Sequence, residues 1–322
     1  MAQLPTEREA VSGGEAMRYL NLGCGKRYHS SWINIDIAPQ GPEIRAYDLS
    51  KGIPLPEGSC DVVYHSNLLE HLRRPQARHL MKECFRVLRP GGILRVAVPD
   101  LEQICRMYLT KLDSALTRDI ARSADCEWMV IELLDQMVRE QSGGDMLTYL
   151  NRDSLPNEVF VYARIGEEGR DLVRSLHRPS SRLKDSAFSI RSFWHEGRRV
   201  LAHAASAFYR GLAHRILWLF LGNTKLRALQ IGRFRLSGEV HHWMYDRYSL
   251  SQLMLEAGFR SPLVLSAEKS RIPEWSTFNL DTLSDGTVIK PDSLFMESTK
   301  PEGESHERQN RCPAQAGQKR DS

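Results

Sequence analysis

Disulfide and metal-binding signatures are absent from this sequence. No two of its six cysteines form a Cys-x-x-Cys pair, and none has a histidine at the spacing of a zinc site. A chain of 322 residues is also long enough to bury a core without disulfide bonds. We therefore expect reduced thiols in a cytoplasmic protein, and no metal site. The six are Cys24, Cys60, Cys84, Cys105, Cys126 and Cys312.

Long apolar segments are absent as well. No run of about 18 apolar residues is available to cross a membrane, and residues 1–16 lack the apolar stretch of a signal peptide. The net charge of +4 is too small to indicate a nucleic-acid partner by itself. Because no base-reading motif is present either, we expect no sequence-specific binding of nucleic acid.

The pattern that is present alternates strands with helices. A chain of this length predicts two domains, or one domain with a large insertion. Alternation implies a parallel sheet with helical crossovers, whereas the middle of the chain is mostly helical in character. We predict a doubly wound, Rossmann-like α/β fold, mostly parallel with an antiparallel terminal strand. The expected parts are a disordered stretch at 1–16, the core at 17–100 and 241–297, the helical insertion at 101–240 and a disordered tail at 298–322.

The individual elements of the core follow from short periodic segments. Apolar, β-branched runs predict strands, and apolar spacings of three and four predict helices. Residues 278–280 and 293–297 are expected to pair as an antiparallel end of the sheet, around the turn Ser284-Asp-Gly286. The expected strands are 18–22, 32–37, 60–64, 93–98 and 261–267, and the expected helices are 76–88 and 249–257.

A glycine turn after the first strand is the first candidate binding feature. Ligands of open α/β sheets bind at the carboxyl ends of the strands, and Gly23-Cys24-Gly25 lies at such an end. Glycine lets the backbone turn tightly and approach a ligand closely. Asp36 ends the second strand, where a carboxylate can accept hydrogen bonds from two ribose hydroxyls. Asp48-Leu49 then precedes the fourth strand, where it fits an adenine contact.

Five ordered motifs follow one another along the predicted core. They are Leu20-Asn-Leu-Gly-Cys-Gly25, Asn34-Ile-Asp36, Asp61-Val-Val-Tyr64, Leu69-Glu-His-Leu72 and Cys84-Phe-Arg-Val-Leu-Arg-Pro-Gly-Gly-Ile93. Together they resemble the class I S-adenosylmethionine-dependent methyltransferases of the methyltransferase-11 type. Look-alikes are bacterial proteins often associated with polysaccharide or secondary-metabolite genes.

The resemblance implies roles for individual residues toward S-adenosylmethionine. The glycine loop would contact the methionine part of the cofactor, Asp36 the ribose, and the segment at Asp48 and Leu49 the adenine. Asn21 stands where the family commonly has an acidic residue, so it would meet the cofactor's ammonium through an uncharged oxygen. The implied contacts are Asn21, Gly23, Cys24, Gly25, Asp36, Asp48, Leu49, and, near the reactive methyl, Ser66 and Asn67.

A dinucleotide or nucleotide-sugar site is the rival interpretation of the glycine turn. Its fingerprint requires a third glycine that packs a helix beneath a pyrophosphate, and this chain has none near His29 and Ser30. The pair Lys26-Arg27 keeps phosphate binding open as an alternative.

Four histidines are candidates for a catalytic base. Methyl transfer from a sulfonium is a direct displacement that needs no metal, although a base assists a hydroxyl acceptor. His65 and His71 follow the fourth strand, and we interpret His71 as a packing residue. His241 and His242 precede the returning helix and are our candidates for the base, with Tyr245 beside them as a substrate contact. The alternative for this segment is a polar loop with an aromatic anchor.

The insertion contains two further candidate features. Residues 135–144 end a helix with polar side chains and two glycines, which fits either a substrate-facing lid that uses Arg139 and Gln141 or a solvated helix end. Residues 164–240 contain fifteen Lys or Arg against six acidic residues, an excess of nine positive charges. Within them, 200–221 has the pattern of a basic amphipathic helix.

Three interpretations of the basic region remain open. It is a solvated helix face, a site for an acidic acceptor, or a peripheral contact with an anionic membrane. For the whole chain we hypothesise O-methylation of a sugar, a glycan or a related small molecule. The alternative is a non-catalytic binding or scaffold protein with a methyltransferase fold.

Overall fold

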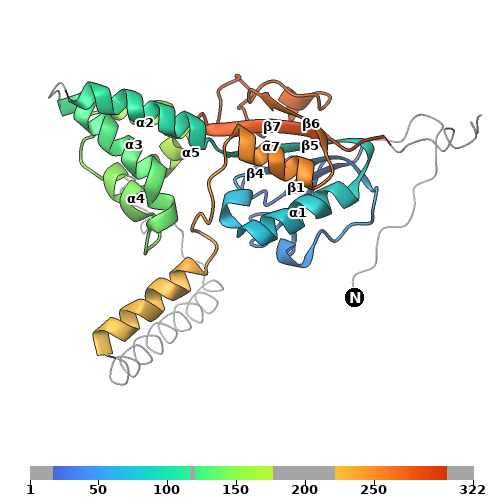
Figure 1. The fold of residues 1–322 in the computed structure, drawn as a ribbon, viewed down its shortest axis with the longest axis horizontal. Helices are drawn as coiled ribbons and strands as arrows, with labels where there is room; N and C mark the ends of the chain where they lie inside the picture. The colour runs from blue at the N-terminus through green and yellow to red at the C-terminus, as the bar shows by residue number, and fades with distance from the viewer. Residues whose placement is uncertain (1–16, 117–119, 177–221, 303–322) are drawn as a thin grey trace, which may run out of the picture.

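The computed structural model describes residues 17–116, 120–176 and 222–302. Figure 1 shows a sheet with two helices in front of it and a helical assembly at one end of the sheet, drawn in green. Among the described residues, no helix is both long and apolar enough to cross a membrane. The five cysteines in these ranges are free thiols, whereas Cys312 and the segment 200–221 lie outside them.

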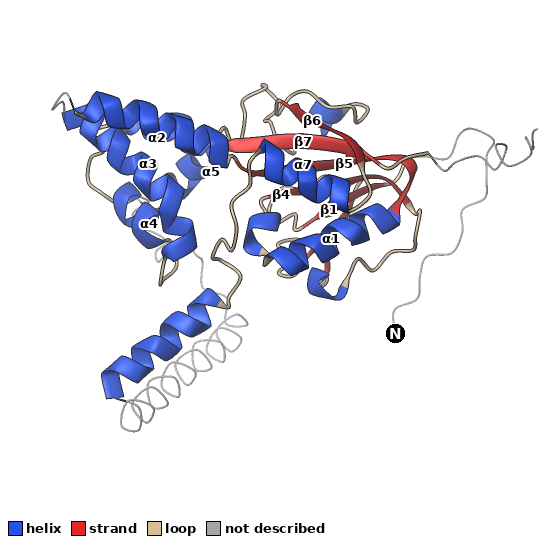
Figure 2. Ribbon diagram, in the orientation of Figure 1, coloured by secondary structure: helices blue, strands red, loops and turns tan. Residues whose placement is uncertain are grey.

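A seven-stranded sheet forms the core, in the order β3-β2-β1-β4-β5-β7-β6. The first five strands are parallel to one another, and β7 runs antiparallel to both of its neighbours. This arrangement confirms the predicted Rossmann-like sheet with an antiparallel terminal strand (Figure 2). The strands are β1 (Tyr19–Leu22), β2 (Ile33–Asp36), β3 (Ile44–Ala46), β4 (Cys60–Ser66), β5 (Leu88–Pro99), β6 (Arg260–Leu265) and β7 (Ser293–Thr299).

The strand order reverses between β1 and β4. From β1 the chain continues outward to β2 and β3, and it then returns to place β4 on the other side of β1. In register, Leu22 at the end of β1 lies opposite Ile35 of β2 and His65 of β4. Connections therefore leave neighbouring strand ends in opposite directions, which is where open α/β sheets bind ligands.

Two helices, α1 (Arg74–Val87) and α7 (Arg247–Glu256), cover one face of the sheet. In α1, Ala77, Leu80, Met81, Cys84 and Val87 are buried at spacings of three and four residues, which is the apolar stripe of an amphipathic helix. The predicted helices at 76–88 and 249–257 are thus confirmed within a few residues.

Aromatic side chains cover the opposite face. Trp32 and Tyr64 project from the sheet and pack against Trp275 and Phe278 of η3 (Trp275–Phe278). Ring centroids of Tyr64 and Trp275 lie 5.3 Å apart in an edge-to-face arrangement, a favourable geometry for aromatic pairs.

The helical character of the insertion is confirmed over its described residues. A separate core forms there around Trp128, Tyr149 and Val161. Residues 222–235 are also helical. The named helices are α2 (Leu101–Ala115), α3 (Ile120–Val138), α4 (Gly144–Leu150) and α5 (Glu158–Leu176).

Three details of the core differ from the sequence-based expectations. Residues 278–280 are not the partner of the terminal strand, because Phe278 ends η3 and β7 pairs with β5 and β6 instead. β7 also continues to Thr299, so the core extends beyond the expected boundary at 297. The short strand β3 had no periodic signal, because only Ile44 of its three residues is buried.

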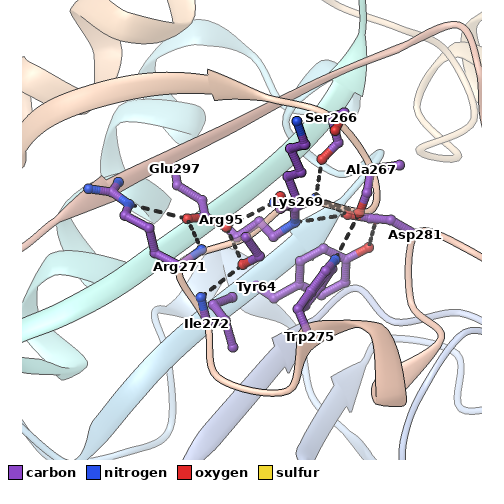
Figure 3. A network of polar contacts seen from close by, with 11 residues as sticks. Tyr64, Arg95, Ser266, Ala267, Lys269, Arg271, Ile272, Trp275, Asp281 and Glu297 are labelled. Carbon is purple, nitrogen blue, oxygen red and sulfur yellow. Dashed lines mark hydrogen bonds and ion pairs between the residues drawn. The ribbon is translucent and has the colours of Figure 1, made fainter.

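A fully buried arginine holds the sheet to the segment that covers its aromatic face (Figure 3). Arg95 of β5 pairs with Asp281 at 2.8 Å and with Glu297 of β7 at 2.8 Å. Its guanidinium also donates to the carbonyls of Ala267 and Lys269, both at 3.0 Å. This network joins two neighbouring strands to the loop between β6 and β7.

Removing Arg95 should destabilise the fold strongly. Arg95→Met leaves the buried Asp281 without its ion-pair partner and Glu297 with Arg271 alone, and losing one partner of a buried ion pair costs about 3–5 kcal/mol. Arg78→Met is the matched control, because Arg78 pairs with Glu256 on the surface and exposed pairs contribute about 0–1 kcal/mol. Urea unfolding measures both variants, and equal losses would contradict the role of Arg95.

A second stability effect concerns His65, which is fully buried in β4 with no hydrogen-bond partner on either ring nitrogen. Burial lowers the pKa of His65 from 6.5 to about 3. Between these two values the unfolded chain binds a proton at His65 that the folded chain excludes. The contribution of the neutral His65 to the free energy of unfolding is therefore complete above pH 6.5 and is lost as the pH falls toward 3.

Replacing His65 with leucine should remove that pH dependence. As the pH falls below 6.5, the native chain should lose stability that His65→Leu keeps. The free energy of unfolding of His65→Leu should therefore exceed that of the native chain by about 1.4 kcal/mol more for each pH unit of the fall. The exposed His79→Leu serves as the control. Urea unfolding from pH 4.5 to 7.5 gives the difference, and a constant offset between the native chain and His65→Leu would rule the explanation out.

Candidate functional site

A crevice of about 870 Å³ opens where the carboxyl ends of β1 and β4 meet. Residues from the loop after β1 line one wall, and Ser66 and Asn67, at the end of β4, line the base. The loop between η3 and β7 and the helix α5 supply the remaining walls. The lining includes Asn21, Gly23, Cys24, Gly25, Lys26, Arg27, Gln40, Tyr64, Glu168, Gly169, Asp171, Leu172, Leu280, Asp281, Ile289, Lys290 and Phe295.

The glycine turn has the backbone geometry that its sequence predicts. Gly23 and Gly25 have φ values of 61° and 52°, in the left-handed region where residues with a Cβ are strained. A Cβ on Gly23 would also lie 3.0 Å from the side chain of Leu68. The turn is fixed to β2 by the Gly23 amide, which donates to the carbonyl of Ile35 at 2.8 Å.

Asp36 connects the end of β2 to this turn. One carboxylate oxygen accepts from the amide of Gly25 at 2.8 Å, and the other accepts from the amide of Ala38 at 2.8 Å. A carboxylate can accept about four hydrogen bonds, so each oxygen keeps a lone pair for a further donor. Asp36 therefore shapes the glycine turn and retains free lone pairs. It is not itself among the residues that line the crevice, so its contact with a ligand hydroxyl stays a prediction.

Asn21 presents an unpartnered oxygen beside the crevice. Its amide nitrogen donates to the carbonyl of Arg27 at 3.0 Å and to the side-chain oxygen of Asn34 at 3.3 Å. Asn34 in turn donates to the carbonyls of His29 and Trp32, which fixes the orientation of both amides. The Oδ1 atom of Asn21 is consequently buried without a hydrogen bond, and it suits a ligand donor such as an ammonium group.

Cys24 is unsuited to act as a nucleophile. Burial, with a contribution from the nearby Asp36 charge, raises the pKa of its thiol to about 11. Because the thiolate is the reactive form, a protonated Cys24 contributes shape to the wall of the crevice rather than chemistry.

The base of the crevice contains a residue in strained geometry. Asn67 has a φ of 49° and accepts a hydrogen bond from the hydroxyl of Ser66 at 3.0 Å. The backbone amide of Asn67 donates to the carbonyl of Ala97 at 2.9 Å. The polar groups of Ser66 and Asn67 are thus held at the end of β4 by the neighbouring strand.

Sequence reasoning missed the wall formed by Tyr64 and Asp281. Tyr64 donates to Asp281 at 2.6 Å, and burial together with the Asp281 charge raises the pKa of Tyr64 well above its usual value. Asp281 is held in turn by Arg95. No local motif marks Asp281, because its distance from Tyr64 along the chain is 217 residues.

Helix α5 supplies the insertion's contribution to the crevice. The helix is kinked at Gly166, whose φ is 61°, and a Cβ there would lie 2.3 Å from the carbonyl oxygen of Ile289. This close approach places the following turn against the crevice, where Glu168 pairs with Lys290 at 3.0 Å. Gly166 gave a detectable sequence signal, since a glycine inside a helical pattern often marks close packing.

The predicted lid residues lie elsewhere. Arg139 is buried and pairs with Asp135 at 2.5 Å and with Glu239 at 3.2 Å. Gln141 is exposed, and its carbonyl accepts from the amide of Gly144 at 3.2 Å. Neither residue lines the crevice, so their proposed contact with a substrate stays a prediction.

The predicted adenine contact is placed near the edge of the sheet. Asp48 precedes η1 (Leu49–Lys51) and accepts from the amide of Ser50 at 3.0 Å, which makes it a helix cap. Its carboxyl pKa is lowered chiefly by that contact with Ser50. Asp48 and Leu49 do not line the crevice, and their role toward a cofactor stays a prediction.

Neither candidate base lines the crevice. His241 is buried, and burial lowers its pKa to about 3. His242 is half-buried with a smaller lowering of its pKa, again chiefly from burial. It lines a separate hollow with Trp243, and Tyr245 is buried with a pKa raised by burial to about 12.

Comparisons with known proteins agree with this geometry over a limited part of the chain. Residues 27–96 match the family model described as a methyltransferase domain. Over 58 residues the chain is 47% identical to a probable S-adenosylmethionine-dependent methyltransferase of Mycolicibacterium smegmatis, which is 18% of this chain and 21% of that relative. The chain therefore matches about a fifth of the length of this curated relative.

Two solved structures show the extent of the structural similarity. One is a complex of the Haloferax volcanii Trm112 methyltransferase activator with a putative methyltransferase. Its TM-score is 0.35 and its sequence identity 10%, and the alignment covers 92% of this chain and 86% of that one. The other is an S-adenosylmethionine-dependent methyltransferase of Thermotoga maritima, described as a possible histamine N-methyltransferase. Its TM-score is 0.32 and its sequence identity 10%, and the alignment covers 89% of this chain and 83% of that one. Because these scores are low, the fold assignment depends on the strand order instead.

The matched segment begins at residue 27, just after the glycine turn, and it contains Asp36, Ser66 and Asn67. Over this segment the chain is similar to methyltransferase domains, and that similarity implies S-adenosylmethionine as the cofactor.

Proposed function

We propose that this chain transfers a methyl group from S-adenosylmethionine to a hydroxyl of a sugar, a glycan or a related small molecule. The observation that carries the proposal is the crevice at the reversal of strand order, with the glycine turn fixed to Asp36 on one side and Ser66 and Asn67 at its base. Its volume of about 870 Å³ lies within the range of about 300–1,000 Å³ for small-molecule sites.

The cofactor contacts follow from the free hydrogen-bonding groups. Asn21 Oδ1 would accept from the ammonium of the methionine part, and the remaining lone pairs of Asp36 would accept from the ribose hydroxyls. Gly25 leaves open space where a side chain would stand, so the ligand can approach the backbone. Cys24 would pack against the cofactor, while Ser66 and Asn67 would lie near the reactive methyl.

The acceptor side is polar. Lys26, Arg27, Glu168 and Asp171 surround the crevice with charges of both signs, which suits a hydroxyl-rich acceptor more than an apolar one. Aligning the acceptor oxygen, the methyl carbon and the sulfur is the main task in a direct displacement, and such positioning contributes about 7–11 kcal/mol to lowering the barrier.

Peripheral membrane contact through residues 164–240 stays a separate prediction. The central part of that region lies outside the described residues. Within the described part, Arg164 pairs with Glu132, Arg174 with Glu167, and Arg227 with Glu140. These pairs reduce the free positive charge of the region. The binding partner that we propose for the protein is therefore the small-molecule or glycan acceptor in the crevice, and not a membrane.

Asp36 gives the most specific test of the cofactor site. Asp36→Asn removes the charge and replaces one acceptor with a donor, so S-adenosylmethionine should bind at least about 10-fold more weakly, a loss of about 1.4 kcal/mol. Titration calorimetry measures the affinity, with Asp113→Asn on α2 as an exposed control. Unchanged affinity in Asp36→Asn, with native circular dichroism, would remove Asp36 from the site.

Turnover separates an enzyme from a scaffold with a retained fold. Labelled S-adenosylmethionine should transfer its methyl group to candidate glycans or to a small-molecule fraction of an extract. Tight cofactor binding without labelling of any fraction would support the non-catalytic alternative.

The two candidate bases are tested in the same assay. Replacing both His241 and His242 with alanine should lower turnover by about 10²–10⁴-fold if one of them accepts the acceptor's proton. The low pKa of His241 makes it a weak base, which favours His242 of the two. Full turnover in a folded double variant would exclude both histidines.

A further inference from the structure

Three potential metal ligands meet beside the crevice, from segments far apart in the sequence. Glu70 and His71 belong to η2 (Leu69–His71), directly after β4, and His241 lies on the segment that returns from the insertion to α7. One ligand atom from each residue lies within 4.8 Å of the other two. The rings of His71 and His241 are 4.7 Å apart between centroids, in an edge-to-face arrangement.

Four polar atoms of this cluster have no hydrogen-bond partner. Both carboxylate oxygens of Glu70 and the Nδ1 atoms of His71 and His241 are buried without a hydrogen bond. Glu70 is fully buried and His241 is 4% exposed. Buried polar atoms are normally paired, so four unpartnered atoms in three neighbouring residues call for a specific explanation.

We propose that Glu70, His71 and His241 form a binding site for a divalent transition-metal ion such as Zn²⁺. Two imidazoles and one carboxylate are a ligand set that binds zinc and neighbouring transition metals. Ligand atoms on a tetrahedral zinc ion lie about 3.3 Å apart, given metal–ligand distances of about 2.0–2.1 Å. Small rotations of three side chains would close the present separations of up to 4.8 Å.

The backbone around the cluster is already fixed. The amide of His242 donates to the carbonyl of Glu70 at 2.6 Å, and the amide of His241 donates to the carbonyl of Gln136 at 2.9 Å. The backbone of Gly238 and Val240 accepts from the ring of His71. Metal-binding histidines commonly donate their second ring nitrogen to such a carbonyl, which orients the ligand nitrogen.

Two positive groups oppose a cation at this place, and both are neutralised. The positive charge of Lys290 lies close enough to interact electrostatically with all three ligands, and that of Arg139 interacts with His241. Lys290 pairs with Glu168 at 3.0 Å, whereas Arg139 pairs with Asp135 and Glu239. The Glu70 carboxylate then supplies the negative charge that the metal requires.

The site would join the insertion to the base of the crevice. Asn67, which lines the crevice, precedes Glu70 by three residues, and His241 follows the last described helical residues of the insertion. A metal bound here would hold the returning segment against the end of β4. The metal proposal does not rest on the proposed methyl transfer; His241 is a candidate residue in both, so metal affinity and turnover are measured separately.

Metal titration of the full chain tests the proposal. After treatment with EDTA, the native chain should bind one Zn²⁺ per molecule in competition with a chromophoric chelator. Co²⁺ should give the absorption of a nitrogen- and oxygen-bound ion, without the charge-transfer band of a thiolate. Failure to bind either metal, or a thiolate band from a cysteine site, would overturn the assignment.

Variants identify the ligands. Glu70→Gln and His241→Ala should each weaken zinc binding by at least about 100-fold. Replacing a residue that only hydrogen-bonds to a metal ligand already lowers metal affinity by about 10–100-fold, and loss of a ligand should cost more. His242→Ala and His79→Ala are matched controls and should keep native affinity. Native affinity in folded Glu70→Gln would contradict the proposal. If His241→Ala does not fold, Glu70→Gln and the native Co²⁺ spectrum still decide the question.

Discussion

The hydrogen bond from the Gly25 amide to the Asp36 carboxylate is the contact on which the candidate site depends. It joins the turn after β1 to the end of β2, at the place where strand order reverses toward β4. The positive φ of Gly25 lets the backbone present its amide in this direction. Together with the bond from the Gly23 amide to the carbonyl of Ile35, that contact fixes the distance from the turn to the acceptor oxygens that we assign to the ribose.

A buried group of charged side chains around Arg95 stabilises the wall of the same crevice. Arg95 neutralises Asp281 and Glu297, and Asp281 in turn orients the Tyr64 hydroxyl on the crevice wall. Such pairs are costly to desolvate, and removing one partner is strongly destabilising because it leaves a buried charge unpaired. A strand, a neighbouring strand and a distant loop are thereby held in one arrangement around the opening.

Local sequence patterns predicted the parts of this molecule that are built from neighbouring residues. The glycine turn, Asp36 and α1 follow from glycine geometry and from apolar spacing, and the structure places the turn and Asp36 together. Contacts between distant segments could not be predicted in this way. Periodicity says nothing about Asp281 reaching Tyr64, or about His241 reaching Glu70 and His71, because those meetings depend on how the insertion returns to the core.

The central claim is that S-adenosylmethionine binds at the junction of β1 and β4. A crystal structure of the chain with S-adenosylhomocysteine, the product form of the cofactor, tests it most directly. We predict ligand density between the turn at Gly23 and Gly25 and the base at Asn67, with the ribose hydroxyls on Asp36 and the amino group on Asn21 Oδ1. Density at another place, or an empty crevice at saturating ligand, would contradict the account.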